Sequence, residues 1–269
     1  MKFSVLMSVY YKEDPKYLKE AIESILNQTV MPSEIVIIKD GKLGDNLNNI
    51  LDQFDKNYKS LFKFIEFEEN QGLGIALRRG VEECSYEIIA RMDTDDIAAK
   101  NRFERELAIM QEKNLDIVGS NIVEFDGNIE NIISKRNVPD TDENIKSYAK
   151  KRNPFNHMTV MYKKSAVLKA GNYKNFLWFE DYNLWIRMIM NGAKMYNIQE
   201  NLVYARTGAS MFERRGGVKY IKREYKMQKE MLKIKFISYK EFMFNILTRS
   251  AVRIMPNKLR GFVYMKMLR

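Results

Sequence analysis

The chain has 269 residues, 45% of them hydrophobic and 12% aromatic, with one cysteine, one histidine and a formal net charge of +10. This composition excludes a solvated, disordered protein, and the length is enough to bury a sizeable core. The lone Cys84 excludes an intrachain disulfide and predicts a reducing cytoplasm, and the lone His157 excludes zinc sites built from several histidines.

The first third of the chain alternates apolar runs with helical patterns. Asp14-Pro15 is typical of a helix N-cap followed by proline at the first helical position. Such alternation predicts an α/β fold with a mostly parallel sheet, right-handed crossovers and helices on both faces, as in nucleotide-binding domains. We expect strands at 3–9, 34–39, 62–67 and 86–92, and helices at 15–27, 46–58 and 72–83. Cys84 is expected to be a small core residue.

The regular alternation stops near residue 124. Asp140 and Glu143 suggest a capping box for a helix that reaches Lys151, and Asn191-Gly192 is placed to end another helix. We expect a catalytic domain over 1–217 and a basic amphipathic helical tail over 218–269, broken near Pro256. The remaining expected elements are helices at 102–113 and 182–190 and strands at 116–124, 157–162, 195–198 and 202–204.

Three carboxylates follow the strand expected at 86–92, namely Asp93, Asp95 and Asp96. In open α/β sheets ligands gather beyond the carboxyl ends of strands. Clustered carboxylates repel one another unless a hard cation shares them, and magnesium, manganese or calcium is the natural partner of oxygen ligands. The alternative is an acidic loop in which Asp96 caps the helix beginning near Asn101; the motif alone does not separate the two.

Other strand ends add side chains suited to a nucleotide. Tyr10 could stack on a base, Asp40 could accept from a base or ribose, and Gly72 and Gly74 permit close approach of the backbone. The glycine spacing matches neither a P-loop nor a dinucleotide fingerprint, so a capped helix start is the alternative for that segment.

Five segments in this order, residues 3–10, 34–41, 70–77, 90–96 and 180–181, resemble motifs of the family 2 glycosyltransferases. The resemblance covers roughly the first 206 residues. It implies the GT-A fold, a Rossmann-like nucleotide-binding domain with a mostly parallel mixed sheet flanked by helices, here with a C-terminal basic helical extension. The phrases at 91–96, 116–120 and 180–185 are typical of bacterial enzymes of capsule, exopolysaccharide and O-antigen assembly, the amylovoran-type transferases.

The resemblance implies an inverting transferase that depends on a divalent metal, Mn or Mg. Asp95 would be the direct metal ligand, with Asp93 bonding the metal, its water or the ribose. Asp181, at the start of a helix, would be the general base, with Glu180 beside it. Without the resemblance, the pair at 180–181 would be read as acids favoured by a helix dipole.

The resemblance also implies a set of donor-binding residues. This chain has Lys39-Asp40 where many members have two acids, so only Asp40 is carried over as the contact to the nucleobase. It has Leu77-Arg78 where many have Arg-Asn, which leaves Arg78 or Arg79 to reach the diphosphate. The full expected set is Ser8, Tyr10, Asp40, Gly72, Arg78, Asp93, Thr94, Asp95, His157 and Trp178. For His157 and Trp178 the alternatives are a structural histidine and a core aromatic.

The basic charge is concentrated at the end of the chain. Residues 218–269 contain fourteen Lys and Arg against three acids, an excess of +11 that leaves −1 for the first 217 residues. Interleaved aromatic and aliphatic residues favour a helix on an anionic membrane surface. The alternative is a helical extension that packs on the domain or on a second copy of the chain; nucleic acid is not expected, because no recognition module accompanies the charge. We expect no signal peptide and no membrane-spanning helix.

Together these features predict transfer of a hexose from a nucleotide sugar, expected to be UDP-linked, to a lipid-linked glycan in surface polysaccharide synthesis. The expected location is the cytoplasm, peripherally on the inner face of a bacterial membrane. Two alternatives remain open: a haloacid-dehalogenase-like phosphotransferase and a non-catalytic nucleotide-sugar-binding subunit. The first usually has Thr or Val two residues after the second Asp of its motif, where this chain has Ile97.

Overall fold

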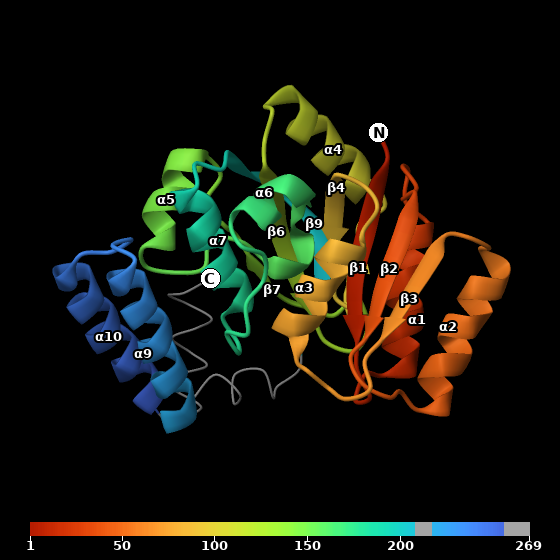
Figure 1. Cartoon of the computed structure of the whole chain (residues 1–269), viewed down its shortest axis with the longest axis horizontal. Coiled ribbons are helices and arrows are strands. Elements are labelled where there is room, and N and C mark those ends of the chain that lie inside the picture. Colours follow the sequence, from red (N-terminus) through yellow and green to blue (C-terminus); the bar gives the residue numbers. More distant parts are fainter. Residues whose placement is uncertain (208–216, 256–269) are drawn as a thin grey trace.

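The computed structural model describes residues 1–207 and 217–255, and within them nine strands form one sheet (Figure 1). The strand order is β3-β2-β1-β4-β8-β6-β9-β5, and β7 pairs with the outer part of β6. The strands are β1 (Phe3–Val9), β2 (Glu34–Lys39), β3 (Phe62–Glu66), β4 (Ile88–Arg91), β5 (Ile97–Ala98), β6 (Ile117–Phe125), β7 (Ile132–Arg136), β8 (Met161–Lys163) and β9 (Met195–Arg206).

Helices cover both faces of this sheet, and two further helices lie at one end of the molecule. They are α1 (Pro15–Leu26), α2 (Asp45–Asn57), α3 (Leu73–Glu83), α4 (Arg102–Glu112), α5 (Asp142–Ala149), the single 3₁₀ turn η1 (His157–Thr159), α6 (Lys164–Lys169), α7 (Glu180–Met190), α9 (Val218–Lys233) and α10 (Tyr239–Ile254). None of the helices in the described ranges is both long and apolar enough to cross a bilayer.

The parallel half of the sheet confirms the predicted alternation. β3, β2, β1 and β4 run parallel as neighbours. The carboxyl ends of these strands therefore share one edge of the sheet, which brings together the loops that begin at Tyr10, Asp40 and Met92. The predicted N-cap at the start of α1 is also confirmed, because Asp14 Oδ1 accepts from the N–H of Lys16 at 2.8 Å.

Two apolar layers hold the helices to the sheet. Alternate residues of β4 enter different layers: Ala90 packs with α1, α2 and α4, whereas Ile89 packs with α3 and α7. Helix α3 approaches β1 closely because Gly80 has no side chain; a Cβ there would lie 2.2 Å from Leu6 Cδ1. Cys84 is buried in the α3 layer, as expected of a small core residue.

The second half of the sheet departs from the sequence predictions. β8 is antiparallel to both β4 and β6, which reverses the sheet beyond its parallel half. The strand expected at 157–162 is instead η1 followed by β8. The two closing strands expected near the end are one long strand, β9, whose pairing with β6 shifts register around Asn121.

Two predicted helix caps are also corrected. Helix α5 is capped by Thr141, whose Oγ1 accepts from the N–H of Asn144 at 3.3 Å, rather than by an Asp140–Glu143 box. Helix α4 begins after Asn101, and Asp96 does not cap it. The carboxylate of Asp96 instead accepts from the N–H of Arg206 at 2.8 Å.

The basic C-terminal region begins as a helical hairpin packed on α7. α9 and α10 lie side by side at the end of the molecule away from α1 and α2 (Figure 1). A separate apolar cluster joins them to α7, with members Phe179, Tyr182, Ile186, Met227, Met231, Ile237 and Phe242. α10 ends at Ile254, and the rest of the predicted tail lies outside the described residues.

Candidate active site

Three carboxylates converge at the end of β4. Asp93, Asp95 and Asp96 each offer an oxygen, and these oxygens lie within 4.8 Å of one another. Burial, followed by the charge of Asp93, raises the pKa of Asp95 to about 7. Burial, followed by the charge of Asp95, raises the pKa of Asp96 well above its ordinary value. Burial and crowding therefore disfavour the ionised forms of these two carboxyl groups.

A fourth acid, Glu13, joins this cluster from the loop after β1. Its Oε2 accepts from Thr94 Oγ1 at 2.6 Å. Burial raises the pKa of Glu13, the bond from Thr94 lowers it, and the charge of Asp93 adds to the increase. Sequence reasoning missed Glu13; the only signal available was its place shortly after a strand whose carboxyl end faces the site.

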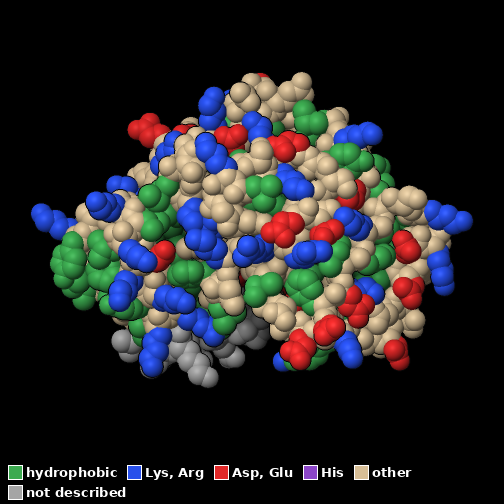
Figure 2. Space-filling model, in the orientation of Figure 1, with side chains coloured by type: hydrophobic (Ala, Val, Ile, Leu, Met, Phe, Trp, Pro, Cys, Tyr) green, Lys and Arg blue, Asp and Glu red, His purple; other side chains and the backbone are tan. Residues whose placement is uncertain are grey.

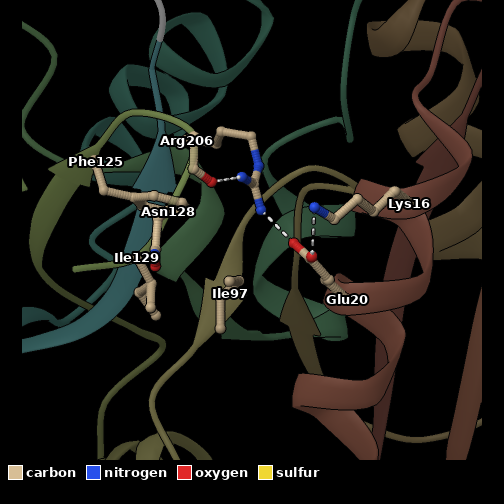
Figure 3. Close-up of a pocket in the computed structure, with 8 residues that line it drawn as sticks. Lys16, Glu20, Ile97, Phe125, Asn128, Ile129 and Arg206 are labelled. Carbon is tan, nitrogen blue, oxygen red and sulfur yellow. Dashed lines mark hydrogen bonds and ion pairs between the residues drawn. The ribbon is translucent and has the colours of Figure 1, made fainter. Parts of the chain in front are cut away.

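Arg206, the last residue of β9, fixes the backbone of the acidic loop. Its Nε donates to the carbonyl of Asp95 at 3.0 Å, and its Nη2 pairs with Glu20 Oε2 at 2.6 Å. The guanidinium also lies over the ring of Tyr17, 3.8 Å from the centroid. Figure 3 shows this arginine between α1 and the loop after β6, at the wall of a cavity of about 300 Å³. The arrangement presents the acidic loop in one defined conformation.

The donor set at the end of β4 fits a divalent cation. Three carboxylate oxygens at short mutual distances are hard ligands, and Mg²⁺ or Mn²⁺ would offset the repulsion among them. The predicted ligands Asp93 and Asp95 are both in the cluster, and Asp96 lies beside them. Their assignment as metal ligands remains a prediction.

The side chain of Asp40 holds the loop that leads into α3. Its two carboxylate oxygens accept from the N–H groups of Gln71 at 2.7 Å and Gly72 at 3.0 Å, so β2 and the start of α3 are tied together. Gly72 has a φ of 88°, which favours glycine. Ser8 lies half-buried near the end of β1, and Tyr10 follows it with its ring 40% exposed. These residues line the same edge of the sheet, as predicted.

Glu180 and Asp181 occupy the first turn of α7. Asp181 Oδ2 accepts from Asn153 Nδ2 at 2.6 Å, and its Oδ1 accepts from the N–H of Tyr182 at 2.7 Å. Burial raises the pKa of Asp181, while these hydrogen bonds and the charge of Arg91 oppose the increase. Burial and the neighbouring Asp181 raise the pKa of Glu180 to about 7.

The remaining predicted site residues have different surroundings. His157 Nε2 lies 3.0 Å from Tyr173 Oη, and burial, followed by the charge of Arg91, lowers the pKa of His157 well below its ordinary value. Trp178 stacks on Tyr220 of α9 with ring centroids 5.2 Å apart. Arg78 is exposed on α3 and pairs with Glu82 at 3.6 Å. Arg78 thus pairs within α3 and Trp178 packs on α9, and the donor contacts of both remain predictions.

An open, mostly parallel sheet with an acidic loop after β4 defines a nucleotide-sugar-binding domain of the GT-A class. Residues 4–177 match the profile of Glycosyl transferase family 2. The chain belongs to this family and is a glycosyltransferase. Membership decides against the haloacid-dehalogenase-like alternative, whose chemistry belongs to a different class of enzyme.

Two full-length relatives are bacterial transferases. The chain is 41% identical over 271 residues to an Escherichia coli UDP-Gal:alpha-D-GlcNAc-diphosphoundecaprenol beta-1,3-galactosyltransferase, an alignment that covers 100% of this chain and 97% of the relative. It is 36% identical over 266 residues to the amylovoran biosynthesis glycosyltransferase AmsE of Erwinia amylovora, covering 98% of each. The predicted family and branch are thereby confirmed.

Solved structures confirm the GT-A fold. Residues 1–349 of S. aureus TarS in complex with UDP-GlcNAc superpose with a TM-score of 0.66 at 18% identity, covering 94% of this chain and 72% of that one. The mannosyltransferase PcManGT from Pyrobaculum calidifontis, in complex with GDP-Man and Mn²⁺, gives 0.64 at 14% identity, covering 96% and 71%.

Proposed function

We propose that this glycosyltransferase moves a hexose from a UDP-sugar to a lipid-linked glycan, with inversion at the anomeric carbon and with the help of a divalent metal. The observation that carries the proposal is the cluster of Asp93, Asp95 and Asp96 oxygens within 4.8 Å, in a chain that belongs to family 2. The name of the E. coli relative supports a UDP-hexose donor and a diphosphoundecaprenol-linked acceptor.

Asp181 is the proposed general base. It would take the proton of the acceptor hydroxyl while that oxygen attacks the anomeric carbon from the face opposite the nucleotide, so that the new C–O bond forms as the bond to the diphosphate breaks. Asn153 and the start of α7 hold one carboxylate geometry for this step. Glu180 lies beside the base, and burial, followed by the charge of Asp181, raises the pKa of Glu180 to about 7.

The acidic loop is proposed to receive the diphosphate. Asp95 and Asp93 would hold a divalent ion, which when bound supplies charge neutralisation for the leaving group. Thr94, fixed by Glu13, sets the conformation of the loop between these two acids. Ser8, Tyr10 and Asp40 remain proposed contacts to the nucleoside because they lie at the ends of β1 and β2. Gly72 remains one because it precedes α3 and its N–H donates to Asp40.

A lipid-linked acceptor would lie at a membrane, and this suggests that the basic C-terminal region binds the membrane surface. We propose that the protein acts peripherally on the inner face of the membrane, with the face formed by α9 and α10 against anionic lipid. Lys222, Lys226, Lys229, Lys233, Lys235 and Lys240 are exposed on this hairpin. Each basic residue near such a surface contributes about 1 kcal/mol. The division into a catalytic domain over 1–217 and a membrane-binding tail over 218–269 is part of the same proposal.

A donor screen tests the proposed reaction. The full chain is mixed with a GlcNAc-diphosphate-lipid acceptor and UDP-Gal, UDP-Glc, UDP-GlcNAc or GDP-Man, with Mn²⁺, Mg²⁺ or EDTA, and products are separated by chromatography. We expect one UDP-hexose to be transferred in the presence of metal and none in EDTA. Thermal shift is recorded in parallel, because a ligand that binds the folded state raises its melting temperature. If no nucleotide sugar shifts the melting temperature even with metal, the proposed donor site fails, and binding of a UDP-sugar without transfer would contradict the proposed acceptor.

A further inference from the structure

Helix α9 of the C-terminal hairpin packs against the residues that lead into α7. The guanidinium of Arg223 lies 3.7 Å from the ring centroid of Trp178, and Tyr220 stacks on the same indole. The ring of Tyr220 also meets Phe179 edge to face, with centroids 5.7 Å apart. Trp178 has a φ of 73°, which a large side chain rarely adopts unless its surroundings impose it. Helix α9 therefore holds a strained backbone three residues before Asp181.

Helix α10 contacts a second segment beside the proposed base. Asn245 Nδ2 donates to the carbonyl of Lys150 at 2.9 Å, and Arg249 Nη2 donates to the carbonyl of Lys151. Two residues further along the chain is Asn153, whose side-chain amide donates to the carboxylate of the base at 2.6 Å. The hairpin thus contacts the chain on both sides of the base: the segment that precedes α7 and the segment that supplies the base with its hydrogen-bond donor.

Polar groups inside the hairpin fix the side chains that make these contacts. Glu224 of α9 is buried and accepts from both Arg249 and Arg253 of α10, the latter at 3.1 Å. Gln228 Oε1, also on α9, accepts from Asn245 at 2.9 Å. Hydrogen-bonded polar groups in a protein interior fix the arrangement of the elements that they join. The side chains that reach the segment after α5 are therefore themselves held in place by α9.

We propose that the C-terminal hairpin positions the base: α9 holds the segment before Asp181, Arg249 holds the segment that leads to Asn153, and the two contacts together maintain the hydrogen bond between Asn153 and Asp181. The inference rests on the proposed role of Asp181 in the transfer reaction. Arg249 is a positioning residue, because it acts through the backbone of Lys151 rather than on a substrate. The hairpin then has a task in the reaction besides its proposed contact with lipid.

The test compares Arg249→Met and Arg249→Lys with the native chain and with Arg105→Met, a control arginine on α4 that pairs with Glu200 at the surface. Methionine removes the hydrogen bond to the segment after α5, whereas Glu224 keeps its bond from Arg253, so we expect the hairpin to stay folded. Lysine can still donate to a carbonyl and should restore part of the native behaviour. Urea denaturation shows whether each variant is folded.

The hydrogen bond between Asn153 and Asp181 gives the first readout. Selective ¹⁵N labelling of asparagine yields the side-chain amide signals by NMR, and Asn153→Ala identifies the signal of Asn153. We expect Arg249→Met to shift this signal away from its native position and Arg249→Lys to shift it less. Arg105→Met should leave it unchanged. The measurement needs no substrate, so it does not depend on the proposed reaction.

Turnover gives the second readout. We expect kcat of Arg249→Met to fall by up to about 10²-fold, the cost of a small displacement of a catalytic group. The affinity for UDP with metal, measured by calorimetry, should stay native, because Arg206 and Glu13 hold the acidic loop. In an Asp181→Asn background the same substitution should cause no further fall, since groups that act as a unit are not additive. A general structural defect lowers kcat by the same factor in both backgrounds.

An unmoved Asn153 signal in folded Arg249→Met overturns the inference, and so does a fall in kcat that is equal in the two backgrounds. If Arg249→Met does not fold, Arg223→Met removes the cation over Trp178 from the other side of the base and is measured in the same way. An Asn153 signal that stays native in this variant also overturns the inference. A native chain that transfers no sugar contradicts the proposed function instead, while the NMR signal still decides whether the hairpin positions the base.

Discussion

The carboxylates at the end of β4 lie close together because of the conformation of the backbone in the loop that follows the strand. The tight loop after the strand places Asp93, Asp95 and Asp96 together, and Arg206 and Thr94 prevent the loop from opening. Burial, followed by repulsion among these acids, raises the pKa values of Asp95 and Asp96. The proposed cation would therefore meet ligands that are already held together, which reduces the reorganisation needed for binding.

At the scale of one residue, the variant Asp181→Asn distinguishes the proposed proton transfer from the binding of the nucleotide sugar. An asparagine keeps the shape of the side chain but cannot take a proton, so we expect kcat to fall by ~10²- to 10⁴-fold. Thermal shift with UDP-sugar and metal should be close to native, because the acidic loop is unchanged. Asp52→Asn, an exposed position on α2, is the matched control and should retain full activity. Loss of nucleotide binding together with turnover would show that Asp181 has a structural role instead.

A second prediction concerns the buried pair Arg102 and Glu106. Both side chains are fully buried, 3.0 Å apart, and Arg102 also donates to the carbonyl of Arg91. Arg102→Met leaves the carboxylate of Glu106 buried without its partner, so we expect the free energy of unfolding to fall by ~3–5 kcal/mol. Urea denaturation measures the change. The double variant Arg102→Met/Glu106→Gln should recover part of the loss, and a double variant as unstable as the single one would argue against the ion pair as the cause.

At the scale of elements, α3 and the segment before α7 make a close contact beside Asp181, the proposed base. A Cβ on Gly74 would lie 2.7 Å from the carbonyl oxygen of Lys174 and 3.2 Å from Glu180 Cβ. Helix α3 and the segment that leads into α7, the helix that carries the proposed base, therefore meet at a glycine. Any side chain there must move the backbone that leads to Glu180.

Gly74→Ala tests this contact. We expect a loss of ~1–3 kcal/mol in stability from overpacking and a larger fall in kcat than in nucleotide affinity, because the start of α7 is displaced. Melting temperature, kcat and thermal shift with UDP-sugar are measured together. Gly44→Ala is the control, since a Cβ there meets nothing within 4 Å. If the two alanine variants behave alike, the contact does not position the base.

The sequence allowed the parallel half of the fold to be predicted because each element there carries its own signal. Apolar runs, Asp14-Pro15 and the glycines before α3 are local features, and parallel strands linked by helices follow from their order. β5, β7, α6 and η1 were missed. β5 has two residues and exists through its pairing with β9, and β7 exposes Ile132 and Ile133 rather than alternating toward a core. Such elements are set by tertiary partners.

The same distinction applies to the site. The acids at 93–96 and 180–181 could be found because they form compact motifs in the family's order, and the structure places them at the end of β4 and the start of α7. Glu13 and Arg206 could not, because their contacts to the acidic loop span 81 and 110 or more residues. Arg249 could not either, because its contact with the carbonyl of Lys151 spans 98 residues.

At the scale of the whole molecule, charge and apolar surface coincide on the hairpin of α9 and α10. Figure 2 shows hydrophobic side chains gathered at the edge of the molecule over α10, with Lys and Arg side chains around them. Four exposed residues of α10, Tyr239, Met243, Phe244 and Leu247, recur at helical spacing. Apolar residues on one face with lysines beside them are typical of a helix that lies in a membrane interface.

Vesicle binding by the full chain tests this arrangement. We expect sedimentation with vesicles of phosphatidylglycerol and phosphatidylethanolamine, weaker sedimentation with neutral phosphatidylcholine, and a decrease at high salt as charges are screened. Phe244→Ser/Leu247→Ser should weaken binding by about tenfold or more, because burying each large apolar side chain contributes ~1.5–3 kcal/mol. The matched control, Met31→Ser/Tyr58→Ser, removes exposed apolar residues outside the hairpin of α9 and α10 and should bind as the native chain does. If the α10 variant binds vesicles normally but no longer self-associates in analytical ultracentrifugation, the apolar row on α10 serves a second copy of the chain rather than lipid.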